Sequence, residues 1–250
     1  MKRTDYTIEV CANSVQSCIA AQQGGADRVE LCAALAEGGI TPSFATIALA
    51  RANTDIALHV IVRPRGGDFL YTALEVDTME ADINAMCSLQ VDGVVVGCLT
   101  ADGDIDLRTL DRLMEAAQGL PVTFHRAFDR CRDPLMAVRQ LRAAGVARIL
   151  TSGQQPTAPE GTDLLRQLVS EAGPQLSIMP GCGVNENNIR QLAADTGAHE
   201  FHFSASTPVK SQMRIRNDQV VMGAAGVDEY TCTETSATRV RRTIEALCGK

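Results

Sequence analysis

Two cysteines lie at matching places in neighbouring predicted strands. Cys11 lies near the end of a strand predicted over residues 7–12, and Cys32 ends a strand predicted over residues 28–32. Neighbouring strands lie about 4.8 Å apart, and thiolate ligands select Cu(I) or Zn(II) over magnesium or calcium. The pair therefore indicates a soft-metal site, with Cu(I) as the candidate ion. The alternative is that both cysteines simply fill space, since cysteine is often buried without any further role.

An arginine- and glycine-rich stretch follows the strand predicted over residues 57–63. It reads Arg63-Pro64-Arg65-Gly66-Gly67-Asp68-Phe69. Guanidinium groups suit carboxylate or phosphate, and paired glycines let the backbone approach a ligand closely. Arg63 and Arg65 are therefore predicted to bind an anionic ligand. Asp68 either joins them or pairs with one of the two arginines inside a tight loop.

A histidine comes near the end of the strand predicted over residues 121–126. His125 is followed by Arg126 and, three residues later, by Asp129. An imidazole in this place is suited to act as a general acid or base, a metal ligand or a hydrogen-bond anchor. Arg126 would add positive charge for an anion, and Asp129 would either orient His125 or cap the next helix.

Two further loops suit a phosphate group. Many parallel barrels bind phosphate between the loops after their seventh and eighth strands, and backbone N–H groups near a helix start contribute to such sites. Here those loops contain Gly181 and Gly183, and His202 and Ser204. The two glycines are equally compatible with a tight turn that has no ligand.

The predicted strands also turn polar side chains to one side. Side chains alternate across a strand, so in each strand the apolar set faces the helices and the other set faces inward. The inward set includes Glu9, Glu30, His59, His125 and His202. Buried charges are costly unless they are paired or bound. The polar interior therefore predicts either a functional site, with Glu9 or Glu30 as catalytic partners, or a structural ion-pair network.

Eight predicted strands, each followed by a helical segment, position these residues. At about 30 residues per repeat they favour an α/β fold of the (β/α)8 TIM-barrel type, with an open doubly wound sheet as the alternative. We expect one domain over residues 1–250. A long segment, 205–232, follows the last strand and is expected to pack across a barrel end or against an oligomer partner. The predicted strands are 7–12, 28–32, 57–63, 93–97, 121–126, 148–152, 176–180 and 200–204.

Composition excludes several classes of protein. The formal net charge of −7 argues against a nucleic-acid-binding protein, which would carry a basic face. No apolar run approaches the roughly 18 residues of a membrane span, and the amino terminus lacks the apolar stretch of a secretory signal. Nine scattered cysteines fit reduced thiols in the cytoplasm better than a disulfide framework.

Several motifs together resemble those of the CutC family. The resemblance implies a cytoplasmic barrel that is often oligomeric, with a homodimer favoured, and that serves copper homeostasis with Cu(I) bound through Cys11 and Cys32. The segment 200–204 departs mildly from the family pattern, which leaves this part of the site less closely matched. The matching motifs lie at residues 9–11, 24–32, 37–43, 63–69, 123–129, 150–153 and 213–217.

Two functions follow from these features. The first is copper homeostasis through Cu(I) binding. The second is a barrel enzyme acting on a small anionic or phosphorylated metabolite. In that enzyme His125 would be the acid or base, Arg63, Arg65 and Arg126 would bind the anion, and a glutamate would assist. A binding module without catalysis is a third alternative.

Overall fold

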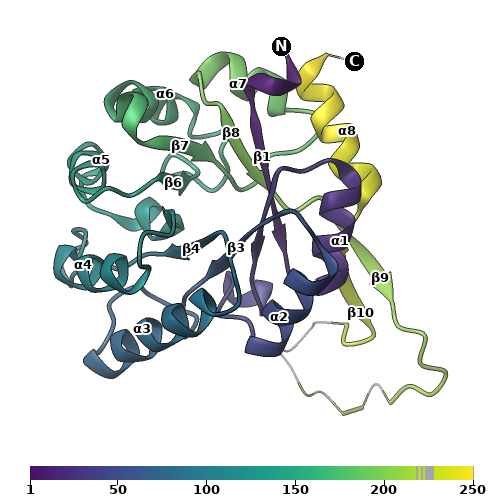
Figure 1. Ribbon diagram of the computed structural model, residues 1–250. Coiled ribbons are helices and arrows are strands. Elements are labelled where there is room, and N and C mark those ends of the chain that lie inside the picture. Colours follow the sequence, from purple (N-terminus) through teal and green to yellow (C-terminus); the bar gives the residue numbers. More distant parts are fainter. Residues whose placement is uncertain (218, 221, 223–227, 250) are drawn as a thin grey trace.

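Parallel strands and helices alternate around a nearly closed barrel, seen in Figure 1, in a computed structural model that describes residues 1–217, 219–220, 222 and 228–249. The predicted (β/α)8 fold is confirmed. The barrel strands are β1 (Thr7–Ala12), β2 (Arg28–Leu31), β3 (Ala57–Ile61), β4 (Gly93–Val96), β5 (Val122–Phe124), β6 (Arg148–Thr151), β7 (Ser177–Pro180) and β8 (Glu200–Phe203). The helices are α1 (Val15–Gly24), α2 (Phe44–Asn53), α3 (Ala73–Cys87), α4 (Leu107–Ala116), α5 (Pro134–Ala143), α6 (Thr162–Ala172), α7 (Ile189–Thr196) and α8 (Ala237–Cys248).

Local signals in the sequence set where the helices begin and end. The Ser14 side chain accepts a hydrogen bond from the Ser17 N–H and caps α1. Asp133 caps α5 in the same way, directly before Pro134. Gly25 ends α1 with a φ of +90°, a conformation that glycine adopts without strain. These caps turn the chain back toward the next strand, so each repeat delivers a strand to the barrel.

The strand order runs from β7 down to β1 and then to β8, and each strand in this order is joined to the next by parallel backbone hydrogen bonds. Between β7 and β8 the described part of the chain has no such ladder, although the two strands lie beside each other. We call this boundary the β7–β8 seam. Side chains rather than backbone bonds therefore close the barrel along this one line.

The main apolar core lies between the strands and the helices. Ile8, Val10, Val29 and Leu31 are fully buried and face outward from β1 and β2, as alternation predicts. A much smaller apolar cluster lies inside the barrel and contains Cys32, Ile61 and Val95. Leu150 and Met179 also face the interior, and charged and polar side chains occupy much of the rest.

The segment 205–232 contains structure that the sequence analysis did not predict. It forms two strands, β9 (Ser206–Lys210) and β10 (Thr231–Thr235), which pair antiparallel and project from the barrel (Figure 1). β-Branched residues in both runs favour strands. The Ser17 hydroxyl accepts a hydrogen bond from the Thr235 N–H and ties β10 to α1. Residues 218, 221 and 223–227 of the predicted segment lie outside the described residues.

None of the helices in the described ranges has the length and apolar composition of a membrane span.

Candidate functional site

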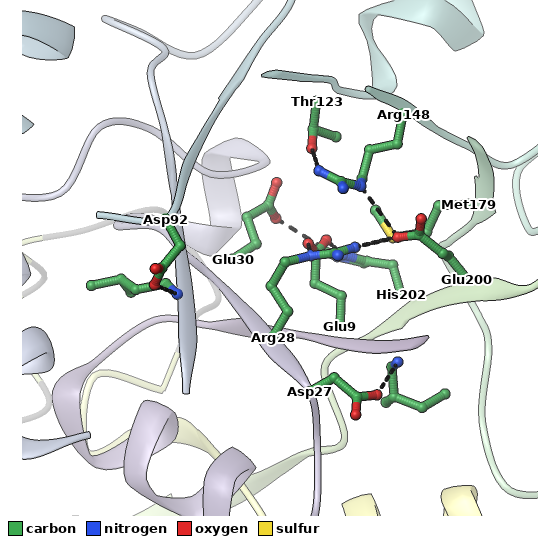
Figure 2. A network of polar contacts seen from close by, with 12 residues as sticks. Glu9, Asp27, Arg28, Glu30, Asp92, Thr123, Arg148, Met179, Glu200 and His202 are labelled. Carbon is green, nitrogen blue, oxygen red and sulfur yellow. Dashed lines mark hydrogen bonds and ion pairs between the residues drawn. The ribbon is translucent and has the colours of Figure 1, made fainter. Parts of the chain in front are cut away.

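A buried ion-pair network fills the amino-terminal half of the barrel interior. Arg28 of β2 lies between two carboxylates, with its Nε 2.5 Å from Glu9 and its Nη2 2.6 Å from Glu200 (Figure 2). Arg148 of β6 contacts Glu200 at 3.2 Å and donates a hydrogen bond to the Thr123 hydroxyl. Because Glu200 lies on β8 and Arg148 on β6, these contacts reach across the β7–β8 seam.

His202 connects this network to the carboxyl-terminal half of the barrel. Its Nδ1 lies 2.7 Å from Glu9 and its Nε2 lies 3.7 Å from Glu30 (Figure 2). Burial acts to lower the pKa of His202, but contacts with Cys11 and the two glutamates outweigh burial and raise this pKa well above its usual value. His202 therefore carries positive charge at neutral pH.

The two glutamates around His202 differ in acidity. Burial acts to raise the pKa of Glu9, but Arg28 and His202 together hold it well below its usual range. The pKa of Glu30 is raised, mainly by burial. The Glu30 carboxylate lies 3.7 Å from His202 Nε2 and also lies near the Cys11 thiol. Glu9 is thus held as an anion, whereas burial favours the protonated form of Glu30.

The two predicted thiols lie side by side. Cys11 Sγ and Cys32 Sγ are 3.8 Å apart. Contact with Cys32 and burial raise the pKa of Cys11 well above its usual value. One ligand atom each of Cys11, Glu30 and His202 also lie within 4.8 Å of one another. Cys11 therefore lies near a soft potential metal ligand, the Cys32 thiol, and near two others, the Glu30 carboxylate and the His202 imidazole.

Two neutral imidazoles occupy space that two glycines leave free. One glycine begins β4 and the other directly follows β4. The ring of His59 lies over Gly93 and the ring of His125 lies over Gly97, where any Cβ would overlap the ring. Burial lowers the pKa of His59 to about 4 and, together with Arg63, that of His125 to about 3. Both rings are therefore uncharged at neutral pH.

Arg63 lies just beyond β3 and is buried beside the cavity. Its Nη1 donates hydrogen bonds to the carbonyls of Glu37 and Gly39, and its Nη2 donates to the carbonyl of Gly67. Its guanidinium also lies over the ring of Phe69, 5.0 Å from the centroid. Arg63 thus holds two loops together while lining the cavity.

Arg126 and Asp129 pair at the rim of the barrel. Arg126 Nε donates to Asp129 at 2.7 Å, and its Nη2 donates to the Ser152 hydroxyl at 2.9 Å. Asp129 also accepts hydrogen bonds from Thr151 and from the backbone after β6. Asp129 therefore neither orients His125 nor caps the next helix, and it instead fixes the loop after β6.

A cavity of about 120 Å³ opens at the carboxyl end of the strands. Two adjacent hollows share Arg126 with this cavity, one running toward the loops after β7 and β8 and the other toward the Arg63 loop. The cavity is lined by Cys11, Glu30, Gly38, Ile61, Arg63, Phe69, His125, Arg126, Leu150 and His202. Residues from most of the barrel strands thus converge on one pocket.

Comparison with known proteins places the chain in a family. The model of the CutC family matches residues 6–207. The chain belongs to the CutC family. A CutC family protein from Bacteroides thetaiotaomicron is 56% identical over 97% of this chain and 98% of its own length. The human copper homeostasis protein cutC homolog is 43% identical over 94% of this chain and 87% of its own length.

Solved structures agree with this assignment. CutC from Streptococcus agalactiae has a TM-score of 0.76 at 35% identity and covers 80% of this chain and 98% of its own. Phosphoribosyl anthranilate isomerase from Thermotoga maritima has a TM-score of 0.61 at 11% identity and covers 98% of this chain and 100% of its own. At that identity the isomerase shows only that the barrel fold is shared.

Within this CutC-family barrel, some predicted residues lie away from the cavity. Arg65 pairs with Glu75 at 2.6 Å and with Asp68 at 3.1 Å, so Asp68 takes the loop-pairing alternative. Neither Arg65 nor Asp68 lines the cavity. Gly183 and Ser204 line the hollow near β7 and β8, whereas Gly181 packs against the side chains of Leu150 and His202.

Two residues of the site were missed in the sequence of this CutC-family chain. Arg148 faces inward from β6, where alternation against buried Ile149 would have revealed it. Phe69 packs against both Arg63 and His125, but a loop aromatic carries no periodic signal.

Proposed function

We propose that this protein binds Cu(I) through Cys11 and Cys32 and acts in copper homeostasis. The observation that carries the proposal is the 3.8 Å separation of the two sulfur atoms. Thiolate sulfur binds a d10 metal ion at about 2.3 Å, so two sulfurs on one ion lie at most about 4.6 Å apart. The observed separation fits one ion held between the two thiolates in a bent arrangement.

The surroundings favour a soft ion of low coordination number. Thiolates select Cu(I) and Zn(II), but structural zinc sites use four ligands. Here the neighbouring His202 is already engaged by Glu9 and Glu30. Cys11 lines the cavity, which gives an ion a route to the otherwise buried Cys32. These features support Cu(I) over zinc.

Replacing both Cys11 and Cys32 by serine is expected to abolish tight Cu(I) binding. The measurement is competition with a chromogenic Cu(I) chelator under anaerobic conditions. The matched control is Cys232→Ser, because Cys232 is exposed on β10, far from the barrel interior. Loss of at least about 100-fold in affinity is expected for the double variant only, since thiolates supply the soft ligands. Equal Cu(I) affinity in the original protein, the double variant and the Cys232→Ser control would exclude copper at this site.

The affinity for Cu(I) is expected to rise with pH. Because the Cys11 pKa is raised well above its usual value, the thiol keeps its proton at neutral pH and the metal must displace it. Each displaced proton makes affinity rise about tenfold per pH unit. The check is the same competition from about pH 6 to about pH 8, corrected for the chelator's own protonation. A flat profile would contradict binding through Cys11.

The proposal also includes a cytoplasmic location and a homodimer. Nine free thiols are compatible with a reducing compartment. The segment after β8 exposes Val209, Met213 and Ile215, which offer apolar area to a second copy of the chain.

A further inference from the structure

Arg63 carries a buried charge that no acid balances. Its side chain is 4% exposed, and within the described ranges it forms no ion pair with any carboxylate. Arg28, which is 6% exposed, has two carboxylate partners. A buried cation without a counter-charge is costly. Three carbonyls stabilise Arg63 in part, but its Nε is buried with no hydrogen-bond partner.

His125 presents a second unused donor to the same cavity. Its Nδ1 accepts a hydrogen bond from the Ala127 N–H at 3.1 Å, so the lone pair lies on Nδ1. A neutral ring with this arrangement carries its hydrogen on Nε2. The Nε2 atom is buried and has no partner among the described residues. His125 therefore offers an N–H at any pH near neutral.

Phe69 brings the two donors together. Its ring lies 5.1 Å from the His125 ring and 5.0 Å from the Arg63 guanidinium carbon. Both Arg63 and His125 line the cavity, and Arg126 lines its entrance. This end of the cavity thus holds two unused donors and the unpaired charge of Arg63, while the hollow at its entrance also contains Glu37 and Asp129, the second of which pairs with Arg126.

We infer that the cavity contains a binding site for a small oxoanion, a carboxylate or phosphate group, held between Arg63 and His125 with Arg126 at the entrance. An oxoanion supplies both the missing counter-charge and acceptors for the two unused N–H groups. The site is separate from the proposed copper ligands, so the inference goes beyond Cu(I) binding.

The rest of the cavity narrows the ligand class. Besides Arg63 and His125, the cavity is lined by the apolar side chains of Ile61 and Leu150. Glu30 and His202 also line it. The volume of about 120 Å³ admits only a small molecule. The ligand would therefore carry its anionic group on a short aliphatic body, with a polar group reaching Glu30.

The test uses inorganic phosphate and acetate as probes, with chloride at equal ionic strength as the reference. We expect a saturable rise in the unfolding temperature with at least one probe. Phosphate alone would indicate a phosphate-bearing ligand, and acetate alone a carboxylate. His125→Asn is expected to weaken binding about tenfold or more, because a charge-assisted hydrogen bond is lost. Arg63→Met should abolish binding if it folds, and Arg126→Gln, at the exposed rim, should weaken it in any case.

Arg65→Gln is the matched control, since Arg65 comes two residues after Arg63 and does not line the cavity. Long-range ¹H–¹⁵N spectra of the four histidines should show His125 protonated on Nε2, with a resonance that shifts when the anion is added. A His125 protonated on Nδ1, no response beyond chloride, or equal loss in Arg65→Gln would overturn the inference.

Discussion

Replacing Arg28 by methionine is expected to lower the free energy of unfolding by about 3–5 kcal/mol. Arg28 lies between Glu9 and Glu200, and its removal leaves two buried carboxylates short of their main partner. The loss is expected to be large because breaking a buried pair leaves an uncompensated charge. Urea unfolding at neutral pH, followed by circular dichroism, measures it.

A surface arginine provides the control for this experiment. Arg112 of α4 pairs with Glu80 and Asp77 at 2.6 and 2.7 Å, so it has as many partners as Arg28. These groups are much more exposed, and exposed pairs contribute about 0–1 kcal/mol. Arg112→Met should therefore lose far less stability than Arg28→Met does. Similar losses in both variants would mean that the interior network adds nothing beyond an ordinary surface pair.

The free energy of unfolding is expected to peak near pH 6.5, the ordinary pKa of histidine. His59 and His125 have folded pKa values of about 4 and about 3, whereas the unfolded chain protonates both below about pH 6.5. Their contribution is therefore present above that pH and lost as pH falls. His202 acts oppositely: its raised pKa keeps a proton that the unfolded chain releases, so its contribution is lost as pH rises.

The free energy of unfolding should change more steeply with pH below its maximum than above it. Below the maximum, unfolding lets His59 and His125 each take up a proton, which changes the folding equilibrium about 100-fold, or about 3 kcal/mol, per pH unit. The raised pKa of Glu30 offsets part of this change in the pH range where Glu30 titrates. His125→Asn should roughly halve the acidic slope. His202→Asn should make the alkaline slope shallower, with part of it kept by the raised pKa values of buried thiols such as Cys11 and Cys18. Unfolding curves from about pH 5 to about pH 8 decide this, and a profile without a maximum would contradict it.

Strand residues of the site could be predicted because alternation is a geometric rule. Glu9, Glu30 and His202 lie inside the barrel since each is one residue away from a buried apolar neighbour that faces the helices. The same rule predicted that Cys11 and Cys32 both face inward, and their sulfur atoms lie 3.8 Å apart. The repeated strand and helix signals were likewise sufficient for the barrel fold.

Loop residues followed no comparable rule. Arg63 and Arg65 are two positions apart, yet only Arg63 lines the cavity, because Pro64 and the glycines direct the chain away from the strand. The partners of Asp129 come from the loop after β6, more than 20 residues along the chain. The β9–β10 pair was missed because its strands are separated by about 20 residues that carry no short turn signal.

The β7–β8 seam is the one strand boundary in the described part of the barrel where side chains, among them the buried ion pairs of Glu200, replace a backbone ladder. Strands held only by side chains separate without breaking a backbone ladder, so fluctuations that open the wall should begin there. Such fluctuations would move Met179 away from Arg28 and widen the hollow lined by Gly183 and Ser204. Within the described residues, the barrel thus has backbone ladders at seven of its eight strand boundaries and side-chain contacts at the eighth, next to the groups that would meet a ligand.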